Sequence, residues 1–305
     1  MKAAPWLTVL ALTACVGVMP PAPSALGAAC VADGGWVRPG VGAVDGATLI
    51  DELADAAVVL LGERHDSAAH HRWQLDTITA LHARGATLVI GLEMFPRRVQ
   101  PALDAWVRGE LDEAEFLTRS DWAKVWRMDA ELYMDIFRFA RERRIALRAL
   151  NVERALVREV GRAGYDGVAP ERREGVGRPS AAPPAYRAWL QDIRRAHHPA
   201  ASDDAAAAAR FVDAQLLWDR AMAEGIVAAR AEHQGAVVVA LIGSGHLRHG
   251  WGVPHQLASL SVVNAVILLP WDRDSRCAEL VDGLATAVYG IGRPPGADAS
   301  GRQRH

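Results

Sequence analysis

Short apolar runs alternate with segments of helical spacing along most of the chain. Five runs rich in valine, leucine and isoleucine are typical of strands, at residues 56–61, 86–92, 145–150, 235–242 and 261–269. Most of them lack the polar alternation of a half-exposed strand, which indicates a sheet covered on both faces. The pattern therefore predicts an α/β fold with a mostly parallel central sheet flanked by helices.

The segments between these runs predict the covering helices. Residues 67–85 and 129–144 carry apolar side chains at helical spacing, and the Ala-rich residues 203–235 predict one long helix. Residues 163–184 are rich in glycine, proline and charge and predict a loop, which a short helix at 185–196 follows. We expect the region from about 165 to 205 to form a helical insertion, or a lid, on the sheet.

The N-terminal residues are not predicted to belong to this fold. The stretch "MKAAPWLTVLALTAC" has one early lysine and an apolar run too short to span a membrane, which is typical of a secretory signal. It ends in "LTAC", which is similar to a bacterial lipoprotein processing box, so we expect Cys15 to be lipidated and to anchor the protein to a membrane. The alternative is cleavage after Ala28 or Ala29, which would leave a soluble periplasmic protein.

These boundaries predict three parts: a leader and tether at 1–29, a single α/β domain at 30–290 and a disordered tail at 291–305. After export, the remaining cysteines are Cys30 and Cys277, which are a candidate disulfide in an oxidising compartment. Two unpaired, buried thiols are the alternative. The formal net charge of -2 argues against a nucleic-acid partner, and the absence of a G-x-S-x-G motif disfavours a serine hydrolase.

Three predicted strands end in the same way. Each runs into a glycine that a carboxylate or an imidazole follows within three residues, in "GERH" (62–65), "GLEM" (91–94) and "GSGH" (243–246). Ligands of open α/β sheets bind beyond the carboxyl ends of the strands. If these strands are parallel neighbours, Glu63, His65, Glu93 and His246 converge on one crevice.

Two kinds of chemistry fit such a cluster. In the first, His65, Glu93 and His246 hold a divalent transition metal with an open position, and Glu63 acts as general base in a hydrolysis.

In the second, the crevice binds haem, which needs an apolar slot, an axial tyrosine or histidine, and basic groups near its propionates. The aromatic candidates for the walls are Trp73, Trp122, Trp126 and Trp251. The basic candidates for the propionates are Arg64, Arg97 and Arg98.

Four segments carry a resemblance to a known family. They are "LLGERHDSAAHHRWQL", "LVIGLEMFPRRVQPALD", "QLLWDRAMAEGIV" and "GSGHLRHGWGVPHQL", in this order along the chain. Together they resemble the ChaN family of haem-binding lipoproteins, which belongs to the wider Tiki, erythromycin-esterase-like and TraB superfamily. The likeness covers about residues 45 to 270.

The resemblance implies an α/β fold, a membrane anchor at the outer membrane or in the periplasm, and haem binding linked to iron uptake, with an outer-membrane haem receptor as a partner. In the family, haems stack face to face between two protomers and a tyrosine ligates the iron. It therefore implies a haem-dependent homodimer, and Tyr133 as the residue in the position of that ligand. Size-exclusion chromatography with and without haemin tests the dimer.

The wider superfamily implies a different activity. Its Tiki members resemble metal-dependent proteases that use two G-x-x-H motifs and a glutamate, a pattern that residues 62–65, 243–246 and Glu93 also match. A third reading is a cell-envelope protein that keeps the fold and binds neither group. Because the segments flanking the motifs are ChaN-like, the function we expect is haem binding in haem and iron acquisition, with metal-dependent hydrolysis as the alternative.

Overall fold

The computed structural model describes residues 30–197 and 204–292. The predicted leader with Cys15, the break at 198–203 and nearly all of the predicted tail lie outside these residues. Among the residues described, no helix is long and apolar enough to cross a membrane.

An eight-stranded sheet forms the centre of the described chain, with the strand order β2-β1-β8-β7-β3-β6-β4-β5. Its strands are β1 (Trp36–Arg38), β2 (Gly42–Val44), β3 (Val58–Glu63), β4 (Leu88–Pro96), β5 (Ala146–Asn151), β6 (Val237–Gly243), β7 (Val266–Trp271) and β8 (Ala287–Gly290). The strands from β8 to β5 pair in parallel, and β1 pairs antiparallel with β2 and β8. The mostly parallel sheet expected from the sequence is confirmed, and β3 to β7 are the five predicted strands.

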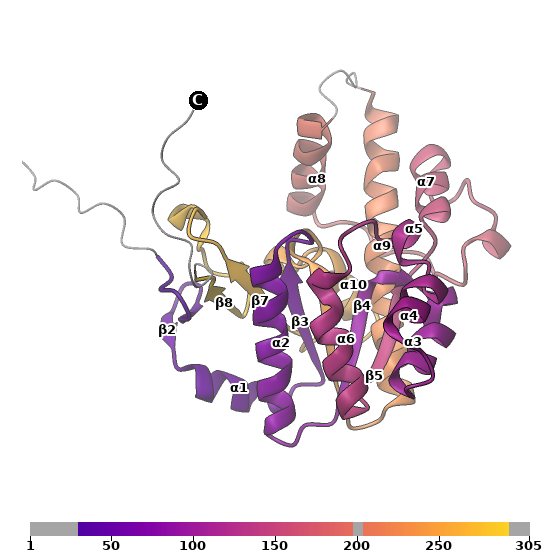
Figure 1. The fold of residues 1–305 in the computed structure, drawn as a ribbon. Helices are drawn as coiled ribbons and strands as arrows, with labels where there is room; N and C mark the ends of the chain where they lie inside the picture. Colours follow the sequence, from indigo (N-terminus) through magenta and orange to yellow (C-terminus); the bar gives the residue numbers. More distant parts are fainter. Residues whose placement is uncertain (1–29, 198–203, 293–305) are drawn as a thin grey trace, which may run out of the picture.

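Helices cover both faces of this sheet. They are α1 (Gly46–Ala54), α2 (Ala68–Ala83), α3 (Gln100–Val107), α4 (Glu113–Arg119), α5 (Trp122–Val125), α6 (Glu131–Arg143), α7 (Arg154–Ala163), α8 (Pro184–His197), α9 (Ala205–Glu232) and α10 (Gly252–Ser259). Figure 1 shows α2 and α6 in front of the sheet and α9 and α10 behind it. One apolar core lies on each side of the sheet.

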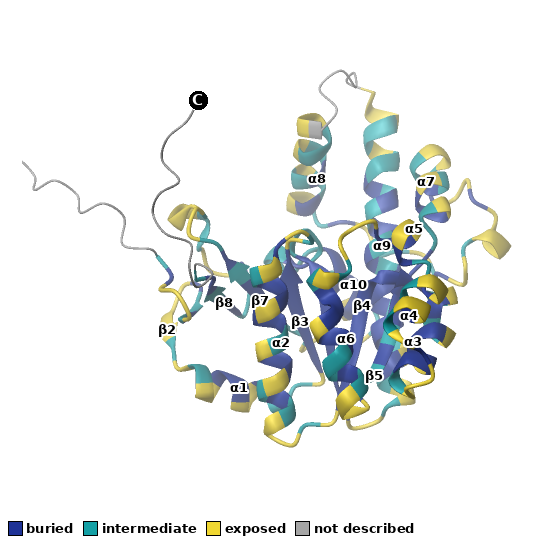
Figure 2. Cartoon of the chain, in the orientation of Figure 1, coloured by how far each residue is buried: buried dark blue, intermediate teal, exposed yellow. Residues whose placement is uncertain are grey.

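Burial explains why the central strands lack polar alternation. Every residue of β3, β4 and β6 is buried, and the helices expose only their outer faces (Figure 2). The long helix α9 packs tightly on the back of the sheet at Gly225, where an added Cβ would lie 3.0 Å from the Cα of Leu150. Because these strands are close-packed on both faces, the positions of their carboxyl ends are fixed.

The strand order places the three glycine-ended strands side by side. β6 lies between β3 and β4, although β4 follows β3 in the chain. Glu63 is opposite Gly243 in the β3–β6 pair, and Leu92 is opposite Leu241 in the β4–β6 pair. Residues that follow β3, β4 and β6 therefore lie at one edge of the sheet.

The predicted insertion stands on that edge. α8 and the first part of α9 project beyond the sheet in Figure 1, and the loop predicted at 163–184 contains only a short 3-10 helix at Pro170–Arg172. The elements that the pattern does not predict are short ones: β1, β2 and β8 have three or four residues each. Strands of this length carry too few positions for a hydrophobic period to be visible.

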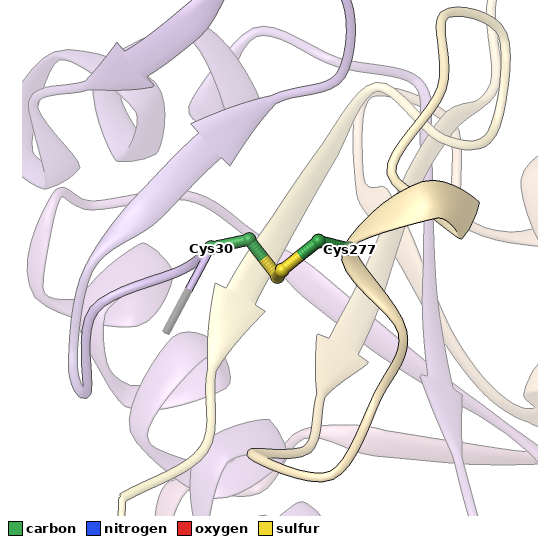
Figure 3. The surroundings of a disulfide bond; sticks show 2 residues. All are labelled: Cys30 and Cys277. Atoms are coloured by element: carbon green, nitrogen blue, oxygen red, sulfur yellow. A yellow bond between two sulfur atoms is a disulfide. The ribbon is translucent and has the colours of Figure 1, made fainter. Parts of the chain in front are cut away.

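A disulfide between Cys30 and Cys277 ties the start of the described chain to the turn after β7 (Figure 3). The two Cα atoms lie 5.6 Å apart and the residues are 247 positions apart in the sequence. A cross-link that closes so long a loop removes much of the conformational freedom of the unfolded chain.

We predict that the paired substitution of Cys30→Ser and Cys277→Ser lowers the free energy of unfolding by about 2 to 5 kcal/mol. Guanidinium denaturation of the oxidised wild type and the double variant measures the difference. The reduced wild type is the matched control and should unfold like the variant. Equal midpoints for the oxidised wild type and the variant would contradict the prediction.

Candidate functional site

Two histidine–carboxylate pairs face each other at the carboxyl edge of the sheet. His65, which follows β3, pairs with Glu63, the last residue of that strand. His246, which follows β6, lies near Glu93 of β4. Gly243 separates the two pairs, since a Cβ added to it would lie 2.9 Å from His65 Cε1 and 3.5 Å from Glu93 Oε2. The structure thus brings together the four residues that the strand ends predicted.

Glu63 is the most heavily bonded of them. Its carboxylate is buried and accepts a hydrogen bond from the Tyr133 hydroxyl at 2.6 Å and one from Gln74 Nε2 at 3.0 Å. His65 Nδ1 lies 2.7 Å from the same oxygen that Tyr133 contacts. His71 Nε2 lies 3.6 Å from the second oxygen, too far for a hydrogen bond but close enough for an ion pair.

These contacts decide the charge of Glu63. Burial acts to raise the pKa of its carboxyl group, but the neighbouring His65 and His71 imidazoles outweigh burial and hold that pKa well below its usual range. Burial acts to lower the pKa of His65, but the hydrogen bond to Glu63 and the negative charges of Glu93 and Glu63 outweigh burial, so the pKa of His65 is raised. The pair is an anionic carboxylate that orients an imidazole.

His65 presents its other nitrogen outward. Its side chain is 33% exposed, and Nε2 has no hydrogen-bond partner among the residues that the structure describes. The ring packs edge-on against Trp126, with 4.6 Å between the ring centroids. An imidazole whose Nδ1 is held by a carboxylate is oriented to accept a ligand or a metal at Nε2.

A local irregularity of β4 positions Glu93. The pairing of β4 with β5 shifts register between Leu92 and Pro96, and such bulges redirect side chains. Asn151 at the end of β5 donates to the Glu93 carbonyl at 2.9 Å. The Glu93 carboxylate accepts the backbone N–H of Gly243 at 2.5 Å, which fixes it beside β6.

His246 is oriented by a buried aspartate of α9. His246 Nδ1 lies 2.6 Å from Asp219 Oδ1, and the Tyr186 hydroxyl of α8 donates to the other oxygen of Asp219 at 2.9 Å. His246 Nε2 lies 3.8 Å from Glu93 Oε1. Burial acts to lower the pKa of His246, but the charge and hydrogen bond of Asp219, together with the charge of Glu93, outweigh burial and raise that pKa to about 9.

The predicted metal ligands His65, Glu93 and His246 therefore surround Gly243. Within residues 30–197 and 204–292, however, no three histidine, cysteine, aspartate or glutamate side chains are arranged so that they could hold a metal ion. The metal-dependent reading and the role of Glu63 as general base stay predictions.

Tyr133, expected from the resemblance as the iron ligand, lies below the crevice. It has no exposed surface, and its hydroxyl donates to Glu63. Two other tyrosine hydroxyl groups are also engaged, that of Tyr165 with the Val176 carbonyl and that of Tyr186 with Asp219.

The three predicted propionate partners are held in ion pairs. Arg64 pairs with Asp66 and with Asp272. Arg97 bonds the Glu174 carbonyl and pairs with Glu224, and Arg98 pairs with Asp121 and Glu153. Apart from Asp66, these partners lie at least 23 residues away in the sequence, so the pattern alone does not reveal them.

Of the predicted aromatic walls, Trp126 contacts His65. Trp122 is buried and donates to the Met128 carbonyl, and Trp73 packs with Trp36 and Tyr289 in a separate aromatic cluster. Trp251 packs against Tyr186 and Trp189 of α8, at the base of the insertion.

Sequence reasoning missed four residues that shape the site: Gln74, His71, Trp218 and Asp219. The signal for Asp219 was present, since it stands among apolar residues on the buried stripe of α9, where a lone carboxylate needs a partner. Gln74 and His71 lie on the buried face of α2 in the same way.

Comparison with known proteins identifies the relationship. A family model described as "Haem-binding uptake, Tiki superfamily, ChaN" matches residues 49–257, which is more than half of the chain. The chain belongs to this family. The resemblance read from the sequence is therefore confirmed, and a comparison with curated proteins gave no match.

The fold is similar to that of one solved structure of the family. The structure described as cofacial haem binding to ChaN of Campylobacter jejuni aligns with a TM-score of 0.67 at 20% identity, over 83% of this chain and 95% of that one. A mutant of the erythromycin esterase EreC in its open conformation aligns with a TM-score of 0.46 at 13% identity, over 78% and 77% of the two chains. The type III effector HopBA1 aligns with a TM-score of 0.43 at 11% identity, over 80% and 91%.

We predict that the Asp219→Asn substitution returns the titration of His246 toward the ordinary histidine value of 6.5, from a midpoint near 9 in the wild type. NMR of the His246 Cε1–H group across pH 6 to 10 measures both midpoints. An unchanged midpoint in the variant would contradict the assignment of Asp219 as the cause.

The same pair makes stability depend on pH. Because the pKa of His246 is higher in the folded state, its contribution is complete below about pH 6.5 and is lost as the pH rises through about 9. Urea denaturation should show this loss in the wild type, whereas the curve of the variant should be flatter over the same window.

Proposed function

We propose that this protein binds haem in the crevice at the carboxyl ends of β3, β6 and β4, and that it serves haem and iron acquisition. Membership of the haem-binding ChaN family supports the proposal. The observation that carries it is His65, a partly exposed imidazole with a free Nε2 and an Nδ1 held by a buried carboxylate. Haem iron takes an axial ligand of this kind.

The surroundings of His65 suit a flat, largely apolar ligand. Trp126 packs against its ring, and Trp218 packs edge-on to His246, with 6.0 Å between the ring centroids. Trp189 of α8 closes over Gly245, where an added Cβ would meet its ring at 3.2 Å. These rings offer apolar surface on both sides of the two imidazoles.

We propose that Tyr133 supports the ligand instead of binding the iron. Its hydroxyl donates to Glu63, and exposure of that oxygen would leave a buried carboxylate with one donor fewer. Glu63 in turn holds His65. Tyr133 is in this account a positioning residue, and His65 is the axial ligand.

We predict that haemin gives a saturable, red-shifted Soret band with the wild type. His65→Ala should weaken haemin affinity more than about a hundredfold, whereas Tyr133→Phe should weaken it about tenfold or less and leave the band position unchanged. Absorbance titration at fixed pH measures both. His233→Ala, at the opposite edge of the sheet before β6, is the matched control and should bind like the wild type.

Two results would contradict this proposal in different ways. No saturable band with the wild type would refute haem binding. A band that Tyr133→Phe removes and His65→Ala leaves in place would refute His65 as the ligand and assign the iron to tyrosine.

We also propose that the protein is exported and lipid-anchored through Cys15. The "LTAC" box and the short apolar run before it support the proposal, and a disulfide between Cys30 and Cys277 fits an oxidising compartment. Lipid attachment would hold the haem site at a membrane surface. The haem-dependent homodimer and the receptor stay predictions from the family.

We predict that Cys15→Ser moves the protein from the membrane fraction to the soluble fraction of the expressing bacterium, with its haemin affinity unchanged. Fractionation followed by immunoblotting measures the distribution, and Ser24→Ala, a substitution between Cys15 and the α/β domain, is the control that should stay with the membrane. If the wild type is already soluble, with a mature chain that starts after residue 28 or 29, the lipid anchor is refuted.

A further inference from the structure

A cavity of about 490 Å³ lies between α1, α2 and the strands β1 and β8. It opens on the side of α2 that faces α1, and Figure 1 shows α6 on the opposite side of that helix. None of Glu63, His65, Glu93 and His246 lines it, so it is separate from the crevice at the strand ends. Its volume is sufficient for a small organic molecule.

Aromatic side chains form much of the buried lining of this cavity. Trp36 of β1 and Tyr289 of β8 are opposite each other in the β1–β8 pair, with 4.8 Å between their ring centroids. Trp73 of α2 stacks on Tyr289, with 5.8 Å between the centroids and 15° between the ring planes. Such rings offer apolar surface to a ligand, and their π-faces attract a cation.

The exposed lining of the cavity carries an excess of negative charge. Asp45 and Asp76 are both exposed there. The hydrogen bond from the Thr48 backbone N–H lowers the pKa of Asp45, so this carboxylate is charged at neutral pH. Arg84 also lines the cavity, but its guanidinium donates to Asp51 at 2.6 Å. The charge at the opening therefore favours a cationic ligand.

Asp76 is the carboxylate that has no partner. Within residues 30–197 and 204–292, it makes neither an ion pair nor a hydrogen bond. The Tyr289 hydroxyl also makes no hydrogen bond in these ranges, and burial and the charge of Asp76 together raise the pKa of that hydroxyl. A carboxylate and a hydroxyl that can both accept, beside aromatic rings, are complementary to an ammonium group.

We propose that this cavity binds a small organic ammonium ion, whose apolar body packs against Trp36, Trp73 and Tyr289 and whose charged nitrogen pairs with Asp76. A neutral molecule of the same shape gains only the apolar contacts. An anion of that shape is repelled by the two aspartates. The site is independent of haem binding, because it shares none of the four crevice residues.

The test compares 2-phenylethylamine, which is protonated at pH 7, with 2-phenylethanol, which has nearly the same shape and no charge. Ligand-observed NMR titration of the purified protein measures both affinities. The wild type should bind the amine at least about fivefold more tightly than the alcohol. Asp76→Asn should remove this preference and leave the affinity for the alcohol unchanged. Asp55→Asn, at an exposed aspartate that does not line the cavity, is the matched control and should keep it.

A second variant tests the location. Ala80 is half-buried on α2 and lines the cavity, so the phenyl ring of Ala80→Phe should occupy it and abolish binding of both probes. Circular dichroism checks that this variant is folded. Asp76→Asn changes an exposed side chain, so it decides the matter even if Ala80→Phe does not fold.

The outcomes also separate this cavity from the crevice. His65→Ala should bind 2-phenylethylamine like the wild type, whether or not the protein binds haem. Loss of amine binding in His65→Ala would place the amine in the crevice and overturn the proposal. No saturable binding of the amine to the wild type, equal wild-type affinity for the two probes, or an unchanged preference in Asp76→Asn would each overturn it as well.

Discussion

The site depends on one buried carboxylate, that of Glu63. A carboxylate taken out of water at the end of a strand is costly unless several donors face it. Here the donors come from three places: Tyr133 on α6, Gln74 on α2, and His65 just after β3. The same contacts that satisfy Glu63 therefore set how two helices dock on the sheet and which way His65 points.

A second histidine–carboxylate pair, His246 with Asp219, is built in the same way on the other side of Gly243. Asp219 is buried on α9, is bonded by Tyr186 of the insertion, and orients His246. Because β6 lies between β3 and β4, the two oriented imidazoles and Glu93 meet at one edge. The Tyr186 hydrogen bond links the insertion to the site. Without it, the buried carboxylate of Asp219 would lose one of its hydrogen-bond donors.

Much of this arrangement can be read from the sequence, for a clear physical reason. Strands buried on both faces are continuous apolar runs, and the glycine-ended motifs mark where each run reaches the ligand edge. That level of reasoning predicted β3 to β7 and the convergence of Glu63, His65, Glu93 and His246. The resemblance of four sequence segments to the ChaN family is a separate observation, and the family model confirms it.

The pattern could not reveal pairings between distant residues. Arg64 and Arg154 are the same residue type in the sequence, but Asp272, which lies 208 residues further along the chain, pairs with Arg64, whereas Arg154 has no ion-pair partner among the described residues. The sequence does not show that Tyr133 has a partner, whereas in the structure its hydroxyl donates a hydrogen bond to Glu63. The short strands β1, β2 and β8 form by pairing with each other and with β7. Pairing between distant segments does not appear as a local hydrophobic period in the sequence.

The most direct test of this account is a crystal structure of the haem complex. The account predicts that the iron is bonded to His65 Nε2 and that the Tyr133 hydroxyl still contacts Glu63. Iron bonded to the Tyr133 oxygen, with Glu63 displaced from its present contacts, would contradict the central role given to that carboxylate.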